Sequence, residues 1–150
     1  MVKSKRFQPI HEIVSNSAND LSRAMADAAK KVSDLEKQLE QLTSYREEYL
    51  KNSAQANASM DAVKMQNFRS FLERLGAAMA QHHKTLDSAR KEYEKRRLAW
   101  SEKRIEAESL SKVMDRFRQE ERSVADRREQ REIDDAALRL SADRRNSGNL

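Results

Sequence analysis

Residues 65–89 read MQNFRSFLERLGAAMAQHHKTLDSA, and the large apolar residues in this stretch recur alternately every three and four positions. The same heptad repeat continues to Val124. Its a positions are Met65, Leu72, Met79, Leu86, Tyr93, Trp100, Ala107, Met114 and Glu121, and its d positions are Phe68, Leu75, His82, Ala89, Arg96, Lys103, Leu110, Phe117 and Val124. A period of 3.5 held over about sixty residues is typical of a helix lying along a partner in a left-handed coiled coil. The stretch therefore predicts one long helix with a narrow buried seam.

A second heptad seam precedes the first and supplies the partner. Its a positions are His11, Ala18, Met25, Val32, Leu39 and Arg46, and its d positions are Val14, Leu21, Ala28, Leu35, Leu42 and Tyr49. Pro9 is the only proline, and proline is tolerated in the first turn of a helix. We expect a helix over about residues 8–52.

A short link separates the two seams. Asn52 can end the first helix, Ser59 can cap the second, and Asp61 would lie in its first turn. We expect a link over 53–60, a second helix over about 61–140 and a disordered tail over 141–150. The chain would form a single all-α domain, an antiparallel coiled-coil hairpin. Folding at about residue 56 would place Phe7 near residue 105 and leave the rest of the second helix without a partner.

The composition fits long helices better than a globular core. Charged residues make up 37% of the chain and aromatic residues 5%, with two glycines and no cysteine. The 30 basic residues are interleaved with 25 acidic ones, which is typical of solvated helix faces and argues against nucleic acid as the partner. No apolar run is long enough for a membrane span, and no signal peptide is evident. We expect a cytoplasmic protein.

Sequence motifs of catalysis and cofactor binding are missing. The sequence has no phosphate-binding glycine loop, no HExxH and no calcium-loop spacing. His82 and His83 are adjacent, so on a helix they point about 100° apart and cannot chelate one ion. We therefore expect a protein that is not an enzyme and has no cofactor or metal site.

Four polar residues interrupt the seam of residues 65–124, namely His82, Arg96, Lys103 and Glu121. The aliphatic stems of Arg96 and Lys103 can lie along the seam with their charges in water, which we favour. Alternatively, these residues fix the register of the two helices. Trp100 at an a position fits a seam-filling side chain better than a ligand platform.

An apolar strip runs beside the seam near the link. It consists of Phe71, Leu75, Ala78 and His82, at spacings of four, three and four. One interpretation is a locally widened core that Tyr45 and Tyr49 cover. The other is a docking face for another protein. The pattern alone favours neither, although a g-position Phe71 should be partly exposed.

Three blocks of sequence resemble one known family. Residues 38–49 (QLEQLTSYREEY) fit the pattern QLxxLxxYxxxY, residues 67–75 with Gln81 and His82 are similar to the start of the family's second helix, and residues 99–104 (AWSEKR) are similar to a third block. The family is FliJ, the chaperone and ATPase-stalk component of flagellar type III protein export. The resemblance covers roughly residues 7–140, although the link after Tyr49 is shorter than in some relatives and lacks their glycine.

The resemblance implies a fold, partners and sites. The fold would be similar to the stalk of the rotary ATPase γ subunit. The termini would enter the hexameric export ATPase (FliI-like) and stimulate it, and helix two would bind the cytoplasmic domain of the export gate (FlhA-like) through Phe71, Leu75, Ala78 and His82. An ATPase regulator (FliH-like) and export chaperones are further possible partners, and these partners would hold the protein at the cytoplasmic face of the inner membrane at the flagellar base.

The arginine-rich end of helix two is the candidate contact with the ATPase ring. It carries Arg116, Arg118, Arg122, Arg127, Arg128 and Arg131. The alternative function is a structural coiled coil that homodimerises through its unpaired end and has no export role. A weaker alternative is nucleic-acid binding by the last three of these arginines, which would fall steeply with salt.

Overall fold

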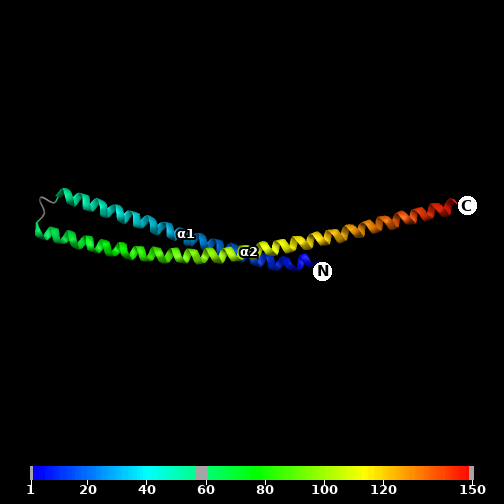
Figure 1. The fold of residues 1–150 in the computed structure, drawn as a ribbon, viewed down its shortest axis with the longest axis horizontal. Coiled ribbons are helices and arrows are strands. Elements are labelled where there is room, and N and C mark those ends of the chain that lie inside the picture. The colour runs from blue at the N-terminus through cyan, green and yellow to red at the C-terminus, as the bar shows by residue number, and fades with distance from the viewer. Residues whose placement is uncertain (1, 57–60, 149–150) are drawn as a thin grey trace. The chain divides into compact units, whose positions relative to one another are not determined.

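The computed structural model describes residues 2–56 and 61–148, and within them nearly every residue is helical (Figure 1). Helix α1 spans Lys3–Ala56 and contains 54 residues. Helix α2 spans Ala62–Gly148 and contains 87 residues. The two helices pack against each other in antiparallel fashion, and no strand occurs in the described residues. The predicted all-α coiled-coil hairpin is confirmed.

Contacts divide the chain into two compact units. One unit is Ala18–Glu102, in which parts of both helices flank the link. The other combines Met1–Ser17 with Lys103–Leu150. Each unit holds its own segment of the seam.

The buried apolar residues all occupy predicted a or d positions. They are Val14, Ala18, Ala28, Leu75, Leu86, Ala89 and Met114. Leu86 is the most enclosed, at 2% exposure. Three residues predicted to lie in the seams are exposed instead, namely Arg46, Met65 and Val124. A two-helix seam has solvent on both sides, so its end positions lose their cover first.

Helix α1 begins at Lys3, about five residues earlier than predicted, so Pro9 lies inside the helix. The residues before Pro9 are held by tertiary contacts. Ser4 is buried and donates two hydrogen bonds to the Glu121 carboxylate, from its backbone nitrogen at 3.1 Å and from its hydroxyl at 2.8 Å. The backbone N–H groups of a first helical turn have no partner within their helix, and a carboxylate there also favours the helix dipole. Glu121 therefore caps α1 from the other helix.

The pairing of Phe7 differs from the sequence-based register. Its ring lies 5.4 Å from the ring of Phe117, not near residue 105. The link lies between Ala56 and Asp61, so its midpoint is later than the assumed residue 56. Helical side chains also tilt toward the N-terminus of their own helix, so antiparallel partners meet beyond their own Cα levels. As a consequence α2 has a partner for longer than predicted.

The helix ends nearest the link also differ from the prediction. Helix α1 continues through Asn52 to Ala56. Asp61 caps α2, since its side-chain Oδ1 accepts a hydrogen bond from the Lys64 backbone nitrogen at 2.8 Å. The predicted cap, Ser59, lies outside the described residues. Asp61 performs the same capping chemistry two positions later.

The predicted disordered tail is helical as far as the structure describes it. Helix α2 continues to Gly148, and the Ser147 hydroxyl donates to the Asp143 carbonyl at 2.9 Å. No proline or glycine interrupts residues 141–147, and Arg145 in the last turn favours the negative end of the helix dipole. High polarity alone did not end this helix.

Candidate functional site

An aromatic cluster lies beside the link in the Ala18–Glu102 unit. Phe68 and Phe71 from α2 meet Tyr45 and Tyr49 from α1. The ring centroids of Tyr49 and Phe71 are 4.4 Å apart, and those of Tyr49 and Phe68 are 5.0 Å apart in a stacked pair. Such pairs stabilise by roughly 0.5–1.5 kcal/mol beyond the area they bury. The cluster anchors this part of the hairpin.

The four residues of the predicted strip differ in how far they face solvent. Leu75 is a core residue with 8% exposure, whereas Ala78 is exposed. Phe71 is half-buried, because Tyr45 and Tyr49 cover part of its ring. His82 is also half-buried, and its Nε2 donates to the Leu35 carbonyl at 2.8 Å. The accessible part of the strip is therefore Ala78 and one edge of Phe71.

Tyr45 belongs to this surface, although the sequence assigned it only a covering role. Its ring stands edge-on to Phe71 at 6.1 Å, and the residue remains 52% exposed. A tyrosine at a g position on α1, facing a phenylalanine at a g position on α2, is the signal that could have placed both on one face. The surface beside the link thus combines Tyr45, Phe71 and Ala78.

Polar residues in the α2 seam make defined contacts. His82 and Arg96 each donate to a backbone carbonyl of α1, and the distance from Arg96 Nη1 to the Ala24 oxygen is 3.1 Å. Glu121 accepts from Ser4, as described above, whereas Lys103 pairs with Glu106 of its own helix at 3.1 Å. Trp100 is half-buried at its a position. The sequence favoured an Arg96 whose stem lies along the seam with its charge in water. The bond to the Ala24 carbonyl instead supports the alternative, in which Arg96 fixes the register of the two helices.

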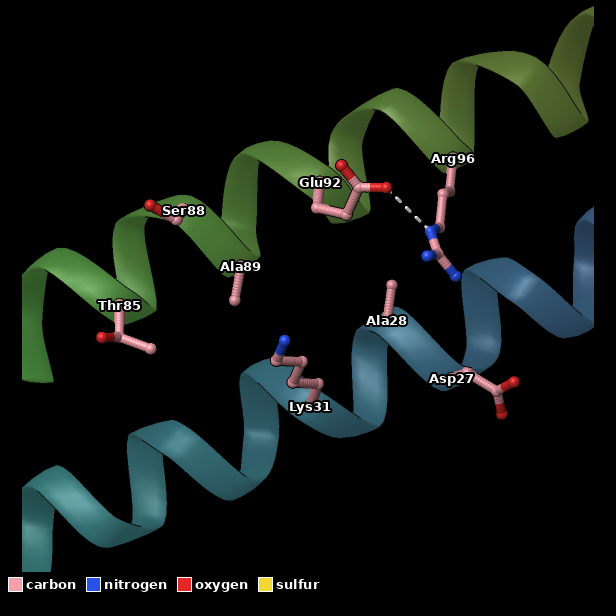
Figure 2. Close-up of a pocket in the computed structure, with 8 residues that line it drawn as sticks. All are labelled: Asp27, Ala28, Lys31, Thr85, Ser88, Ala89, Glu92 and Arg96. Atoms are coloured by element: carbon pink, nitrogen blue, oxygen red, sulfur yellow. Dashed lines mark hydrogen bonds and ion pairs between the residues drawn. The ribbon is translucent and has the colours of Figure 1, made fainter.

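A shallow groove of about 370 Å³ lies where α1 and α2 present small residues to each other (Figure 2). Ala28 and Ala89 form its apolar floor, and Asp27, Lys31 and Glu92 stand at its rim. Arg96 is held there by Glu92, with 3.1 Å between Nε and Oε1. The charges at the rim alternate in sign and the floor consists of two methyl groups. The groove is therefore explained by the loose packing of small seam residues and does not indicate a ligand site.

The candidate ATPase-contact arginines divide into two sets. All six are exposed. Arg116, Arg118 and Arg122 lie on the part of α2 that α1 still accompanies, since Phe117 and Glu121 have partners there. Arg127, Arg128 and Arg131 follow the last of these contacts. The expectation that α2 lacks a partner after about residue 105 was wrong, because α1 starts earlier and pairs further along.

One exposed ion pair in α2 shifts the pKa values of both its members. The Arg97 side chain donates to Glu94, one turn earlier, and this hydrogen bond lowers the pKa of Glu94 and raises the pKa of Arg97. Among the described residues, no group of three or more histidine or carboxylate side chains could hold a metal ion. None of the described helices is long and apolar enough to cross a membrane.

Comparison with known proteins gives one match. The family model described as "Flagellar FliJ protein" matches residues 3–146 of the 150-residue chain. No curated protein and no solved structure matches the chain. The match covers α1 in full and α2 up to residue 146.

Proposed function

Because this chain belongs to the FliJ family, whose members are non-catalytic components of the flagellar protein export apparatus, we propose that it is the stalk that couples the export ATPase to the export gate. In this role it would engage a FliI-like ATPase hexamer, dock on the cytoplasmic domain of a FlhA-like gate and assist the cycling of export chaperones. It would act in the cytoplasm, held at the membrane by these partners.

The observation that carries the proposal is the difference in length between the two helices. Helix α2 contains 87 residues against 54 in α1, and three exposed arginines, Arg127, Arg128 and Arg131, follow the contact of Glu121 with Ser4. An α-helix with its side chains is only about 10–12 Å across, narrow enough to enter the centre of a protein ring. Exposed arginines supply the charge to contact several subunits there.

The ATPase contact is tested by removing the two arginine sets separately. We expect Arg127, Arg128 and Arg131 changed together to Gln to abolish most of the stimulation of the purified export ATPase. The same change at Arg116, Arg118 and Arg122 should have a smaller effect, because these residues lie beside α1. The matched control is Lys84, Lys91 and Lys95 changed to Gln, which removes equal charge from exposed positions elsewhere on α2. Full stimulation by both arginine variants would refute the assignment.

The gate contact is tested by a substitution that leaves the core alone. Ala78 is exposed, so Ala78→Arg should barely change the melting temperature while blocking a surface that includes Phe71 and Tyr45. Ala80→Arg is the matched control, because Ala80 is also exposed and lies about 200° around the helix from Ala78.

A second variant measures the strength of the gate contact. Phe71→Ala should weaken gate binding by roughly thirtyfold, as expected for an aromatic anchor worth about 2 kcal/mol. It should also lower stability through its lost contacts with Tyr45 and Tyr49. Each variant is titrated against the gate domain and against the ATPase. Unchanged gate affinity in Ala78→Arg would remove this surface from the proposal.

A further inference from the structure

The last part of α2 carries a pattern that reads the same in both directions. The residues are Glu129, Ile133, Ala136, Ala137, Leu140 and Arg144, which we call the 129–144 face. Their spacings are four, three, one, three and four. At 100° per residue all six fall on one side of the helix, within about 50° of a common line.

The 129–144 face is open to solvent and points away from the seam. Ile133 is 55% exposed and Leu140 is 62% exposed. Both occupy the f position of the heptad that places Phe117 and Glu121 against α1, and f lies opposite a and d. The pairing of α1 with α2 therefore leaves this face bare.

The two ends of the face carry opposite charges. Glu129 lies at its N-terminal end and Arg144 at its C-terminal end, and neither forms an ion pair within the described parts of the chain. No ion pair joins the charged side chains of α2 after Arg118 in the described parts of the chain, although the Gln130 amide donates to Asp134 at 3.2 Å. A centre of two alanines between these ends allows two helices to approach closely.

We propose that the 129–144 face binds the same face of a second copy of this chain, in antiparallel orientation about a two-fold axis between Ala136 and Ala137. With this axis, Ile133 lies opposite Leu140 of the second copy, and Glu129 lies opposite its Arg144. The Glu129–Arg144 ion pair and the Ile133–Leu140 contact then each form twice, as an isologous interface requires. A parallel pairing would set Glu129 against Glu129 and Arg144 against Arg144, which costs free energy.

The interface is small, so the association is weak. Two Ile–Leu contacts and four alanines bury far less than the roughly 1,200 Å² of a standard interface. We expect a dissociation constant on the order of 100 µM. Dimers would therefore form only where the local concentration of the chain is that high. The proposal does not depend on the export role, since the palindrome and its charges alone carry it.

Charge reversal tests the pairing in the full chain by sedimentation equilibrium. Glu129→Arg and Arg144→Glu should each weaken self-association about tenfold, because each creates two like-charge contacts. An equimolar mixture of the two variants should associate again, because every contact then joins opposite charges. Asp135→Arg is the matched control, on the seam side of the same segment, and should associate like the unmodified chain.

Cross-linking tests the orientation, and the chain has no cysteine of its own. Ala137→Cys should oxidise to a disulfide-linked dimer, because it lies next to the axis. Ile133→Cys alone should not, since its counterpart lies about 10 Å along the helix, but it should link to Leu140→Cys in a mixture. A chain that stays monomeric at millimolar concentration, an unrestored variant mixture, or efficient linking of Ile133→Cys to itself would overturn the proposal.

Discussion

His82 and Arg96 show how a polar residue can occupy a coiled-coil seam without weakening the partner helix. Each donates to a carbonyl of α1, at Leu35 and Ala24 respectively. In an α-helix such a carbonyl already accepts the N–H four residues on, but its oxygen has a second lone pair. Both helices therefore keep their own backbone hydrogen bonds. The added bond between them can form in only one register of α1 against α2.

Replacing Arg96 should loosen the register of the two helices while leaving the stability of the hairpin nearly unchanged. We expect Arg96→Leu to change the free energy of unfolding by less than about 1 kcal/mol, because an apolar seam residue offsets the lost bond. Spin labels at Asp34→Cys and Lys84→Cys, both exposed and both within the Ala18–Glu102 unit, should then show a broader distance distribution. Arg97→Leu, outside the seam, is the control and should leave the distribution unchanged. An equally narrow distribution in Arg96→Leu would rule out a register role.

Leu86 should be among the most costly seam positions to truncate. Leu86, at an a position of α2, is 2% exposed, whereas Leu35, at a d position of α1, is half-buried. We expect Leu86→Ala to cost about 2–4 kcal/mol and Leu35→Ala clearly less, because less of its surface leaves water. Urea unfolding followed by circular dichroism measures both. Equal costs would mean that exposure does not rank the seam residues.

The Glu94–Arg97 pair predicts a small pH dependence. The hydrogen bond from Arg97 lowers the pKa of Glu94 in the folded chain. A carboxylate with a lowered pKa contributes stability above its unfolded pKa and loses it as the pH falls through the folded pKa. Glu94→Gln should therefore melt slightly lower than the unmodified chain at pH 7, and the difference should vanish in acid, once the pH has fallen below the lowered pKa of Glu94. A difference that persists in acid would point to another cause.

At the scale of the helices, periodicity predicted the elements and local signals misplaced their ends. Every buried apolar residue sits at a predicted a or d position, because the heptad repeat directly encodes which face is buried. The start of α1 depends on Ser4 meeting Glu121, which are 117 positions apart. No window of sequence contains both residues, so Pro9 looked like the natural start.

The candidate site was predictable in position more than in exposure. The spacing of Phe71, Leu75, Ala78 and His82 placed all four on one strip. In the structure Leu75 is buried, Phe71 and His82 are half-buried, and only Ala78 is exposed. Tyr45 joins the surface only because the register brings it to Phe71. The arginine positions were plain in the sequence. How far α1 accompanies them depended on the link, which the composition did not locate to within a turn.

Gly76 offers a stabilising change in α2. It lies mid-helix, and a Cβ built on it meets nothing within 4 Å. Gly76→Ala should raise stability by roughly 0.5–1 kcal/mol, since alanine loses less backbone entropy on folding. Thermal melting measures the gain, with Ala77→Gly as the converse at the neighbouring exposed position. A lower melting temperature for Gly76→Ala would contradict the prediction.

Across the whole molecule, protection from hydrogen exchange should follow the seam. Leu75, Leu86 and Ala89 are buried, whereas every described residue after Glu121 is exposed. A helix without tertiary packing opens readily, so amides over 129–148 should exchange at least about tenfold faster than those over 75–89. Mass spectrometry of peptides from the exchanged chain measures this directly. Equal protection would mean that residues 129–148 are packed in solution, and slowing with rising concentration would fit self-association.

The bonds from His82 and Arg96 also bear on which residues are free to change over evolutionary time. Their acceptors are peptide oxygens, which every amino acid supplies. Substitutions at Ala24 or Leu35 can alter packing, yet they leave the acceptor in place. The donors on α2 have no such latitude, since few side chains reach that far with an N–H. Mutational tolerance should therefore differ between the two sides of these bonds. The acceptor positions on α1 can change freely, whereas the donor positions on α2, which set the register of the two helices, should change little.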